Sequence, residues 1–306
     1  MNVVKVKSYA KLNLTLEILG VEKGYHLLDS LVTSVDIYDL IVLKKRKDKF
    51  SRVVMHGMNS ESIPPEKNNA LKAAERFSDR FGTFGADITV YKNIPIGAGL
   101  GGSSADISGV INGMAKLYGV ADFAALKTLA DELGSDTGYM LTGGFARMCG
   151  RGEKVQPLRV ETTLHFLLLC PQSSVSTGAC FQVYDQTYSG KVLEKTTEKC
   201  IRALVENDKE GVGRYLTNDL LAAATSLNRD IEKTIEEAQA FSPLGVGMSG
   251  SGSCVFALFE SKELCEWAKS RYRGKCRAIV AQSVQNKKNS VFKNPFTLTE
   301  GEALRR

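Results

Sequence analysis

The stretch Pro95-Ile96-Gly97-Ala98-Gly99-Leu100-Gly101-Gly102-Ser103-Ser104-Ala105-Asp106 decides how this chain is organised. It lies between an alternating run, residues 86–92, that is typical of a strand and an apolar-periodic run, residues 107–118, that is typical of a helix. Glycines let a backbone approach a ligand closely, and the following helix directs unpaired N–H groups and its positive dipole end into the loop. The stretch therefore predicts a phosphate-binding loop.

Familiar Gly-rich loops explain this stretch less well. A Walker P-loop requires a Lys after its glycines, and none follows Gly101-Gly102. The GxGxxG dinucleotide pattern matches residues 97–102, but residues 86–92 alternate where that fold needs a continuously apolar strand, and Asp122 opens a helix-like run. The HRD and DFG strings of protein kinases do not occur. We therefore expect the loop to hold the phosphates of a nucleotide.

The composition of the chain is that of an ordinary soluble protein. Its 306 residues, 43% hydrophobic and 24% charged, allow one large or two medium domains. The net charge of +6 is spread among acids, apart from residues 44–49, and fits an enzyme with anionic substrates better than a nucleic-acid binder. The longest apolar run is too short to span a bilayer, and no signal peptide is visible, so we expect a cytoplasmic protein without a membrane partner. Seven Cys without CxxC spacing and three His without metal spacing predict reduced thiols and no protein-bound metal.

Strands and helices come in runs rather than in βαβ alternation, so the predicted class is α+β. Strands are expected at residues 2–8, 12–19, 30–35, 40–44, 51–56, 164–170, 246–248, 254–259 and 277–281. Helices are expected at residues 70–81, capped by Asn68-Asn69, and at 104–118, 123–133, 197–206, 229–240 and 261–272. We divide the chain into domains 1–157 and 158–284, and expect residues 285–306 to be a mobile tail.

Two further segments are rich in glycine. Residues 143–153 are typical of a turn between strands, for which we expect no direct ligand role. Residues 245–254 alternate Gly and Ser after a short apolar strand, which favours a nest of N–H groups aimed at an anion. We expect this second segment at the active site.

Three motifs together resemble those of the GHMP kinases, the superfamily of galactokinase, homoserine kinase, mevalonate kinase and phosphomevalonate kinase. The first is Lys11-Leu12-Asn13-Leu14, the second is residues 95–105, and the third is residues 245–253. The resemblance runs from the N-terminus to about residue 283. It implies an ATP-binding N-terminal domain like domain 2 of ribosomal protein S5, a ferredoxin-like α/β C-terminal domain, and transfer of phosphate from ATP to a small-molecule alcohol.

Within that superfamily, residues 8–14 and Gly24-Tyr25-His26 resemble the members that phosphorylate the 2-hydroxyl of 4-diphosphocytidyl-2-C-methyl-D-erythritol in isoprenoid precursor biosynthesis. This resemblance implies that Asp136 accepts the hydroxyl proton, while Lys11 keeps Asp136 ionised and neutralises charge on the transferring group. From the residues alone, an N-cap of residues 137–141 explains Asp136 at least as well, and a solvated strand face explains Lys11.

The resemblance also implies how two ligands bind. ATP with Mg2+, the metal held mainly through the phosphates, would contact Pro95, Gly97, Ala98, Gly99, Leu100, Gly101, Gly102, Ser103 and Ser104, with Asn68 and Lys92 near the adenine. For the acceptor, Tyr25 would stack on the cytosine, Phe181 would cover its other face, and His26 would bond its edge. Asn13 would lie near the erythritol chain, with Thr177 as a further contact. The third motif would contribute Gly247, Ser249, Gly250, Ser251 and Gly252.

Some residues depart from the family pattern. The stretch Asp136-Thr137-Gly138-Tyr139 lacks the usual Pro, residues 106–109 replace small alanines, and Asn69 replaces an apolar residue. These departures leave open a paralogue that acts on a homoserine- or mevalonate-like alcohol, a nucleotide-binding protein without catalysis, and an RNA-binding module, although the scattered charges argue against the last. As partners we expect only small molecules, for a monomer or a weak homodimer.

Overall fold

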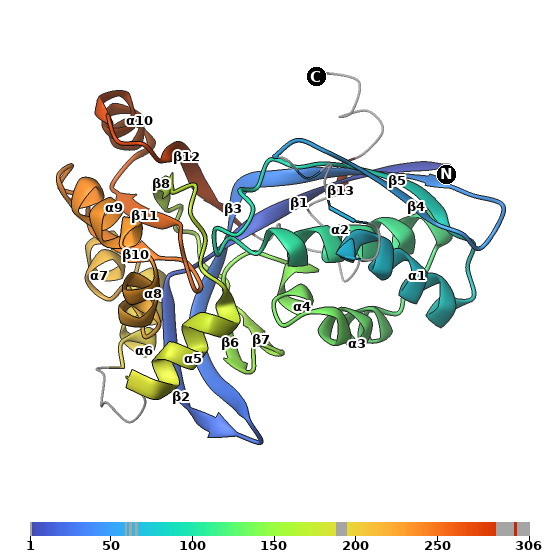
Figure 1. Ribbon diagram of the computed structural model, residues 1–306, viewed down its shortest axis with the longest axis horizontal. Coiled ribbons are helices and arrows are strands. Elements are labelled where there is room, and N and C mark those ends of the chain that lie inside the picture. The colour runs from blue at the N-terminus through green and yellow to red at the C-terminus, as the bar shows by residue number, and fades with distance from the viewer. Residues whose placement is uncertain are drawn as a thin grey trace.

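The computed structural model describes residues 2–58, 60, 63–64, 67–187, 195–285 and 297–298. Figure 1 shows two lobes joined through a sheet, with most of the first half of the chain on the right of the view and most of the second half on the left, where β2 also lies. Helices and strands are mixed in both lobes, so the predicted α+β class is confirmed. Among the described helices, none combines the length and the apolar character needed to cross a membrane.

The longest strand of the first lobe is β3 (Tyr25–Lys45), which pairs antiparallel with β1 (Val3–Asn13) and β5 (Ala86–Tyr91). The prediction of separate strands at residues 30–35 and 40–44 is wrong, because β3 continues through both. A shift of register between Tyr9 and Ala10 of β1 marks a bulge, which lets such a long strand bend without ending. The edge strand β4 (Arg52–His56) runs parallel to β5.

Helices α1 (Asn69–Phe81), α2 (Gly102–Tyr118) and α3 (Phe123–Leu133) lie on one side of this sheet (Figure 1). Two glycines of α2 bring the helix close to β3, since a Cβ at Gly109 would lie 2.4 Å from Ile41 and one at Gly113 would lie 2.3 Å from Leu43. The predicted cap of α1 is confirmed, because the Asn68 side chain accepts hydrogen bonds from the first N–H groups of the helix.

The second lobe is built on the antiparallel order β10 (Gly245–Met248), β11 (Val255–Phe259), β8 (His165–Cys170) and β12 (Arg277–Val284). The end of β12 pairs with β3, which makes the sheet continuous between the lobes. The helices of this half are α5 (Thr177–Thr187), α6 (Thr197–Val205), α7 (Lys209–Arg214), α8 (Leu221–Leu227), α9 (Asp230–Gln239) and α10 (Lys262–Arg271). The remaining elements are β2 (Thr15–Glu22), which pairs with β3, and the short α4 (Thr137–Met140), β7 (Lys154–Pro157), β9 (Thr217–Asn218) and β13 (Thr297–Leu298).

The segment 143–153 is not merely a turn. Strand β6 (Ala146–Gly150) pairs with β3 and with β7, so the turn itself is limited to residues 151–153. The predicted domain boundary at residue 157 falls between β7 and β8 and stays a prediction. The predicted tail lies outside the described residues, apart from Gln285 and the backbone of β13, which pairs with β1.

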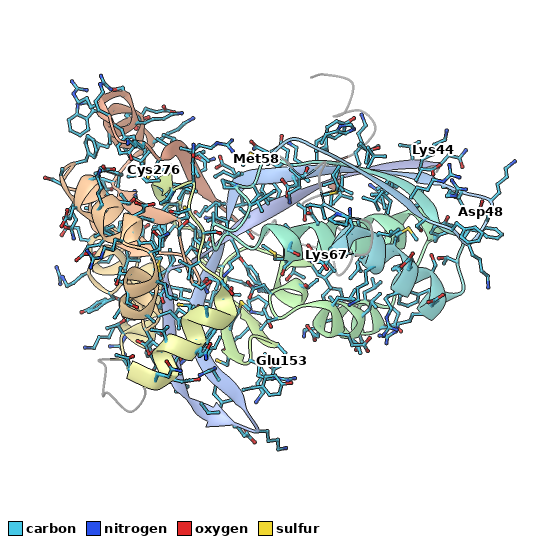
Figure 2. The ribbon with its side chains drawn as sticks, in the orientation of Figure 1. Lys44, Asp48, Met58, Lys67, Glu153 and Cys276 are labelled. Carbon is cyan, nitrogen blue, oxygen red and sulfur yellow. The ribbon has the colours of Figure 1, made fainter. Side chains whose placement is uncertain are left out.

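The basic run at residues 44–49 lies at the end of the first lobe that is remote from the second (Figure 2). Arg46 within it donates hydrogen bonds to Asp48 and, at 2.6 Å, to Asp87. Part of its positive charge is therefore balanced by neighbouring carboxylates.

Candidate active site

A cavity of about 690 Å³ is lined by side chains from both lobes. It collects residues that are far apart in the sequence: the end of β1 with Lys11 and Asn13, the Gly-rich loop, the Asp136 turn, the start of α5 and the third motif. Nearly all predicted site residues line it: Lys11, Asn13, Tyr25, His26, Asn68, Lys92, Pro95, Gly97, Ala98, Gly99, Leu100, Gly101, Gly102, Ser103, Ser104, Asp136, Thr177, Phe181, Gly250 and Ser251. Gly247, Ser249 and Gly252 are not among its lining residues.

The Gly-rich loop has the geometry of an anion site. Gly97, Gly99 and Gly101 adopt positive φ of 69°, 74° and 71°, which non-glycine residues rarely adopt. Gly101 is the N-cap of α2 and provides no side-chain hydrogen bond, so the N–H groups of the first turn keep their capacity for a ligand. At this helix end both the unpaired N–H groups and the positive dipole end favour phosphate.

The third motif packs against this loop, backbone to backbone. A Cβ at Gly99 would lie 2.1 Å from the Ser249 carbonyl oxygen, so only glycine permits this contact. The Ser249 hydroxyl donates to the Gly99 carbonyl at 2.9 Å, and the Cys254 N–H donates to the Ala98 carbonyl at 3.1 Å. Ser249 therefore supports the loop from behind, and the Gly250-Ser251 pair faces the cavity.

Gly247 and Gly252 allow close packing around the third motif. A Cβ at Gly247 would lie 2.5 Å from the ring of Phe256, so this glycine makes room for a core aromatic on β11. A Cβ at Gly252 would lie 2.9 Å from the sulfur of Met248. Both positions serve the packing of the third motif, and neither one lines the cavity.

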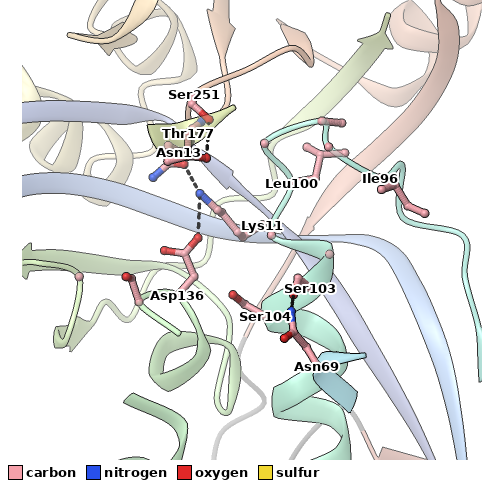
Figure 3. A pocket seen from close by; sticks show the side chains of 18 of the residues that line it. Lys11, Asn13, Asn69, Ile96, Leu100, Ser103, Ser104, Asp136, Thr177 and Ser251 are labelled. Atoms are coloured by element: carbon pink, nitrogen blue, oxygen red, sulfur yellow. Dashed lines mark hydrogen bonds and ion pairs between the residues drawn. The ribbon is translucent and has the colours of Figure 1, made fainter. Parts of the chain in front are cut away.

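Lys11 and Asp136 meet beside the Gly-rich loop (Figure 3). The Lys11 ammonium lies 3.3 Å from Asp136 Oδ2, and the Lys11 backbone N–H donates to the Leu100 carbonyl at 3.0 Å. The Lys11 side chain is buried, whereas that of Asp136 is 30% exposed and reaches the cavity. Asp136 occupies the N-cap position of α4, but its side chain makes no capping hydrogen bond. The carboxylate is therefore directed to Lys11 and the cavity.

Asn13 holds Lys11 in this position. Its Oδ1 accepts hydrogen bonds from the Lys11 ammonium and, at 3.1 Å, from the Gly250 N–H, while its Nδ2 donates to the Ser30 hydroxyl at 2.9 Å. Asn13 thus links the first motif to the third. Nearby, the Thr177 and Ser251 hydroxyls lie 2.9 Å apart, which joins the start of α5 to the third motif (Figure 3).

One end of the cavity, here called the aromatic end, is lined by Tyr25, His26 and Phe181. The His26 ring stacks on Phe181 with 4.5 Å between ring centroids, and its Nε2 lies 2.7 Å from Asp185 Oδ1. Tyr25 is largely exposed, and the Arg151 guanidinium lies 4.6 Å from its ring centroid. The predicted group of Tyr25, His26 and Phe181 is thus brought together, while the role of each ring toward a base stays a prediction.

Lys92 lies between two buried carboxylates beneath the loop. Its ammonium is 2.5 Å from Asp39 Oδ2 and 2.7 Å from Asp106 Oδ2. Burial opposes the charged form of Lys92, but the two carboxylates together raise its pKa. Burial also raises the pKa of Asp106, to about 7, because one ammonium cannot compensate two carboxylates in this environment. The charge of Lys92 is therefore compensated within this cluster. Lys92 and Asn68 both line the cavity, and their position near the adenine stays a prediction.

Sequence reasoning missed several residues of the site. Asp39 also accepts hydrogen bonds from the N–H groups of Asn93 and Ile94, at 2.6 and 2.9 Å, and is fully buried. The available signal was an acidic residue directly before the apolar run of residues 40–43. Arg151 and Gly152 of the segment 143–153 also line the cavity, although this segment was expected to be a turn only. Among the described residues, no three His, Cys, Asp or Glu side chains are grouped so that they could hold a metal ion.

Comparison with known proteins gives consistent results. The family model of the GHMP kinase N-terminal domain matches residues 68–148. The family model of the GHMP kinase C-terminal domain matches residues 200–275. A protein of Clostridium beijerinckii named 4-diphosphocytidyl-2-C-methyl-D-erythritol kinase is 34% identical over 278 residues, which cover 88% of this chain and 97% of the relative. A protein of Carboxydothermus hydrogenoformans with the same name is 36% identical, with 82% and 87% covered.

Solved structures agree with these relatives. The chain is similar to a crystal structure of 4-(cytidine 5'-diphospho)-2C-methyl-D-erythritol kinase, with a TM-score of 0.76, 27% identity, and 91% of this chain and 98% of the other covered. It also shares its fold with a homoserine kinase from Cytophaga hutchinsonii, with a TM-score of 0.74 at 21% identity and 94% and 96% covered.

Proposed function

This chain belongs to the GHMP kinase family, and from that premise we propose that it transfers the γ-phosphoryl group of ATP to the 2-hydroxyl of 4-diphosphocytidyl-2-C-methyl-D-erythritol. The observation that carries the proposal is the Lys11–Asp136 pair, 3.3 Å apart beside the Gly-rich loop. Relatives named for this kinase, which match most of the chain, support this acceptor. The step belongs to the synthesis of isoprenoid precursors.

The geometry supports the following division of labour. Asp136 accepts the proton of the acceptor hydroxyl as its oxygen attacks the γ-phosphorus. Lys11, fixed by Asn13, keeps the Asp136 carboxylate ionised and balances negative charge on the transferring group. The first turn of α2 and the loop glycines hold the phosphates through backbone N–H groups.

The loop also suits a divalent metal that is carried by the nucleotide. The Ser103 and Ser104 hydroxyls line the cavity at the helix end, and together with phosphate they offer oxygen atoms, which Mg2+ prefers. Mg2+ supplies charge neutralisation across the phosphate oxygens when it is bound. Asn68 and the Lys92 segment then border the adenine.

The aromatic end of the cavity would receive the cytosine. Tyr25 and Phe181 provide rings for stacking, and His26, whose Nε2 is held by Asp185, provides its other ring nitrogen for the base edge. Stacking of this kind contributes roughly 1–3 kcal/mol per base. We further propose a division of the chain near residue 157, a monomer or weak homodimer, and action in the cytoplasm without nucleic-acid partners.

An acceptor panel tests this function. The purified protein is incubated with ATP, Mg2+ and one alcohol at a time, and ADP release is coupled to NADH oxidation. We expect turnover with 4-diphosphocytidyl-2-C-methyl-D-erythritol and none with homoserine or mevalonate. Turnover with a different alcohol only would support a kinase but contradict the proposed acceptor. No turnover with any alcohol would overturn the proposal.

A further inference from the structure

Some cationic side chains that line the cavity pair with a carboxylate, and others do not. Lys11 pairs with Asp136, and Lys92 pairs with Asp39 and Asp106. The cavity has two other cationic side chains, Lys67 and Arg151, and neither pairs with a carboxylate within the described residues. These two side chains are therefore the free positive charges that the described part of the cavity wall offers to an anionic ligand.

The two cations belong to different ends of the cavity. Lys67 precedes the α1 cap and is labelled in Figure 2 beside α1 and α2, at the nucleotide end. Arg151 is in the turn after β6, together with Glu153, which Figure 2 labels near α5 and β7. The phosphates of ATP, held by the Gly-rich loop, account for a cation such as Lys67. A second cation at the aromatic end is available to a second anion.

Arg151 lies between the aromatic end and the Asp136 turn. Its guanidinium is 4.6 Å from the centroid of the Tyr25 ring, a cation–π contact that holds an otherwise exposed side chain over the cavity wall. The next residue, Gly152, packs against the Asp136 turn, because a Cβ there would lie 3.3 Å from the Ser135 carbonyl oxygen. Arg151 and Gly152 therefore border the cavity between the Tyr25 ring and the Asp136 turn.

We propose that Arg151 binds the diphosphate of the acceptor and gives the enzyme its preference for a diphosphate-linked alcohol over a free one. The inference rests on the proposed function, since a nucleoside diphosphate ester carries its two phosphates between base and alcohol. Guanidinium presents a planar set of N–H donors that fits phosphate oxygens, and such charge-assisted hydrogen bonds are about twice as strong as neutral ones. Within the described residues, the guanidinium contacts the Tyr25 ring and pairs with no carboxylate, so its N–H donors stay available to a phosphate.

A binding cycle tests the inference. Affinities of cytidine and of CDP are measured by calorimetry while a non-hydrolysable ATP analogue and Mg2+ fill the nucleotide site. CDP should bind the wild type at least about tenfold more tightly than cytidine, as expected for charge-assisted hydrogen bonds. In Arg151→Gln this advantage should disappear with cytidine affinity within about threefold of wild type, and Arg151→Lys should restore part of it. Lys23→Gln, an exposed cation of the β2–β3 turn outside the cavity lining, is the matched control.

The outcomes separate the inference from the function. Retained cytidine affinity in Arg151→Gln shows that the variant is folded. An unchanged ratio of CDP to cytidine affinity in that variant would overturn the role of Arg151 and leave the kinase proposal intact. Failure of the wild type to bind either ligand would overturn both. In steady state, Arg151→Gln should raise KM for the acceptor about tenfold, with KM for ATP unchanged.

Discussion

The charge state of a single residue depends on its neighbours in the fold, as in the cluster of Asp39, Lys92 and Asp106. In the sequence they are an ordinary scatter of charges, and Lys92 alone was assigned to the nucleotide site. In the structure the three lie together, all of them buried, under the start of α2. Asp106 Oδ1 has no hydrogen-bond partner there, so this carboxylate is the least compensated member.

The titration of Asp106 gives a prediction about stability. Its pKa in the folded protein is raised from 3.8 to about 7, chiefly by burial, so the folded state holds this proton more tightly than the unfolded chain. The contribution of Asp106 to stability is therefore lost as pH rises from about 4 through 7. We expect Asp106→Asn, which removes the titration, to gain in Tm relative to wild type between pH 5 and pH 8, by on the order of a few degrees.

The measurement is thermal unfolding of both proteins across that pH range without ligand. Asp79→Asn, at an exposed position of α1, is the control for the loss of a carboxylate and should keep a constant Tm difference from wild type. A constant difference for Asp106→Asn as well would mean that Asp106 stays ionised in the folded protein throughout.

At the scale of elements, the site depends on two loops that touch through glycine. Gly99 combines a φ of 74° with a backbone contact to the third motif, and Ser249 and Cys254 add hydrogen bonds across the same junction. Each loop was predicted from its own composition. That they share one interface is a property of the fold, because β10 and β11 carry the third motif to the Gly-rich loop.

A pair of substitutions isolates that interface. Gly99→Ala places a Cβ 2.1 Å from the Ser249 oxygen, whereas Gly119→Ala has the same φ of 74° and nothing within 4 Å. Gly119→Ala should cost only the conformational strain, about 1–2 kcal/mol. Gly99→Ala should lower the free energy of unfolding, measured by urea denaturation, by more than Gly119→Ala does. It should also weaken ATP binding about tenfold or more, because the loop must move. Equal losses in the two variants would show that the contact between the loops is unimportant.

For the whole molecule, much of the architecture was predictable. The α+β class, the position of the Gly-rich loop and the cap at Asn68 follow from local patterns, since strand alternation, helix periodicity and capping are short-range properties. The single strand β3 was not predictable, because its continuity depends on pairing with β1, β5, β6 and β12, which are distant in the sequence.

Site residues could be predicted only where they belong to a motif of the family. Lys11 and Asp136 came from family resemblance, and the folded chain brings them within 3.3 Å. Arg151 was overlooked because its segment is typical of a plain turn, and its position at the cavity depends on contacts with distant residues such as Tyr25. Contacts between segments far apart in the chain are what local patterns do not contain.

Whether Asp136 is the base of the transfer beside the Gly-rich loop is decided by a single-turnover measurement. Enzyme loaded with ATP, Mg2+ and 4-diphosphocytidyl-2-C-methyl-D-erythritol is quenched over time, for wild type and for Asp136→Asn. Because Asn cannot accept the hydroxyl proton, the transfer rate in the variant should fall by about 10²–10⁴-fold, with both ligands bound within about threefold of wild-type affinity. An unchanged transfer rate in Asp136→Asn would contradict the assignment of Asp136 as the base.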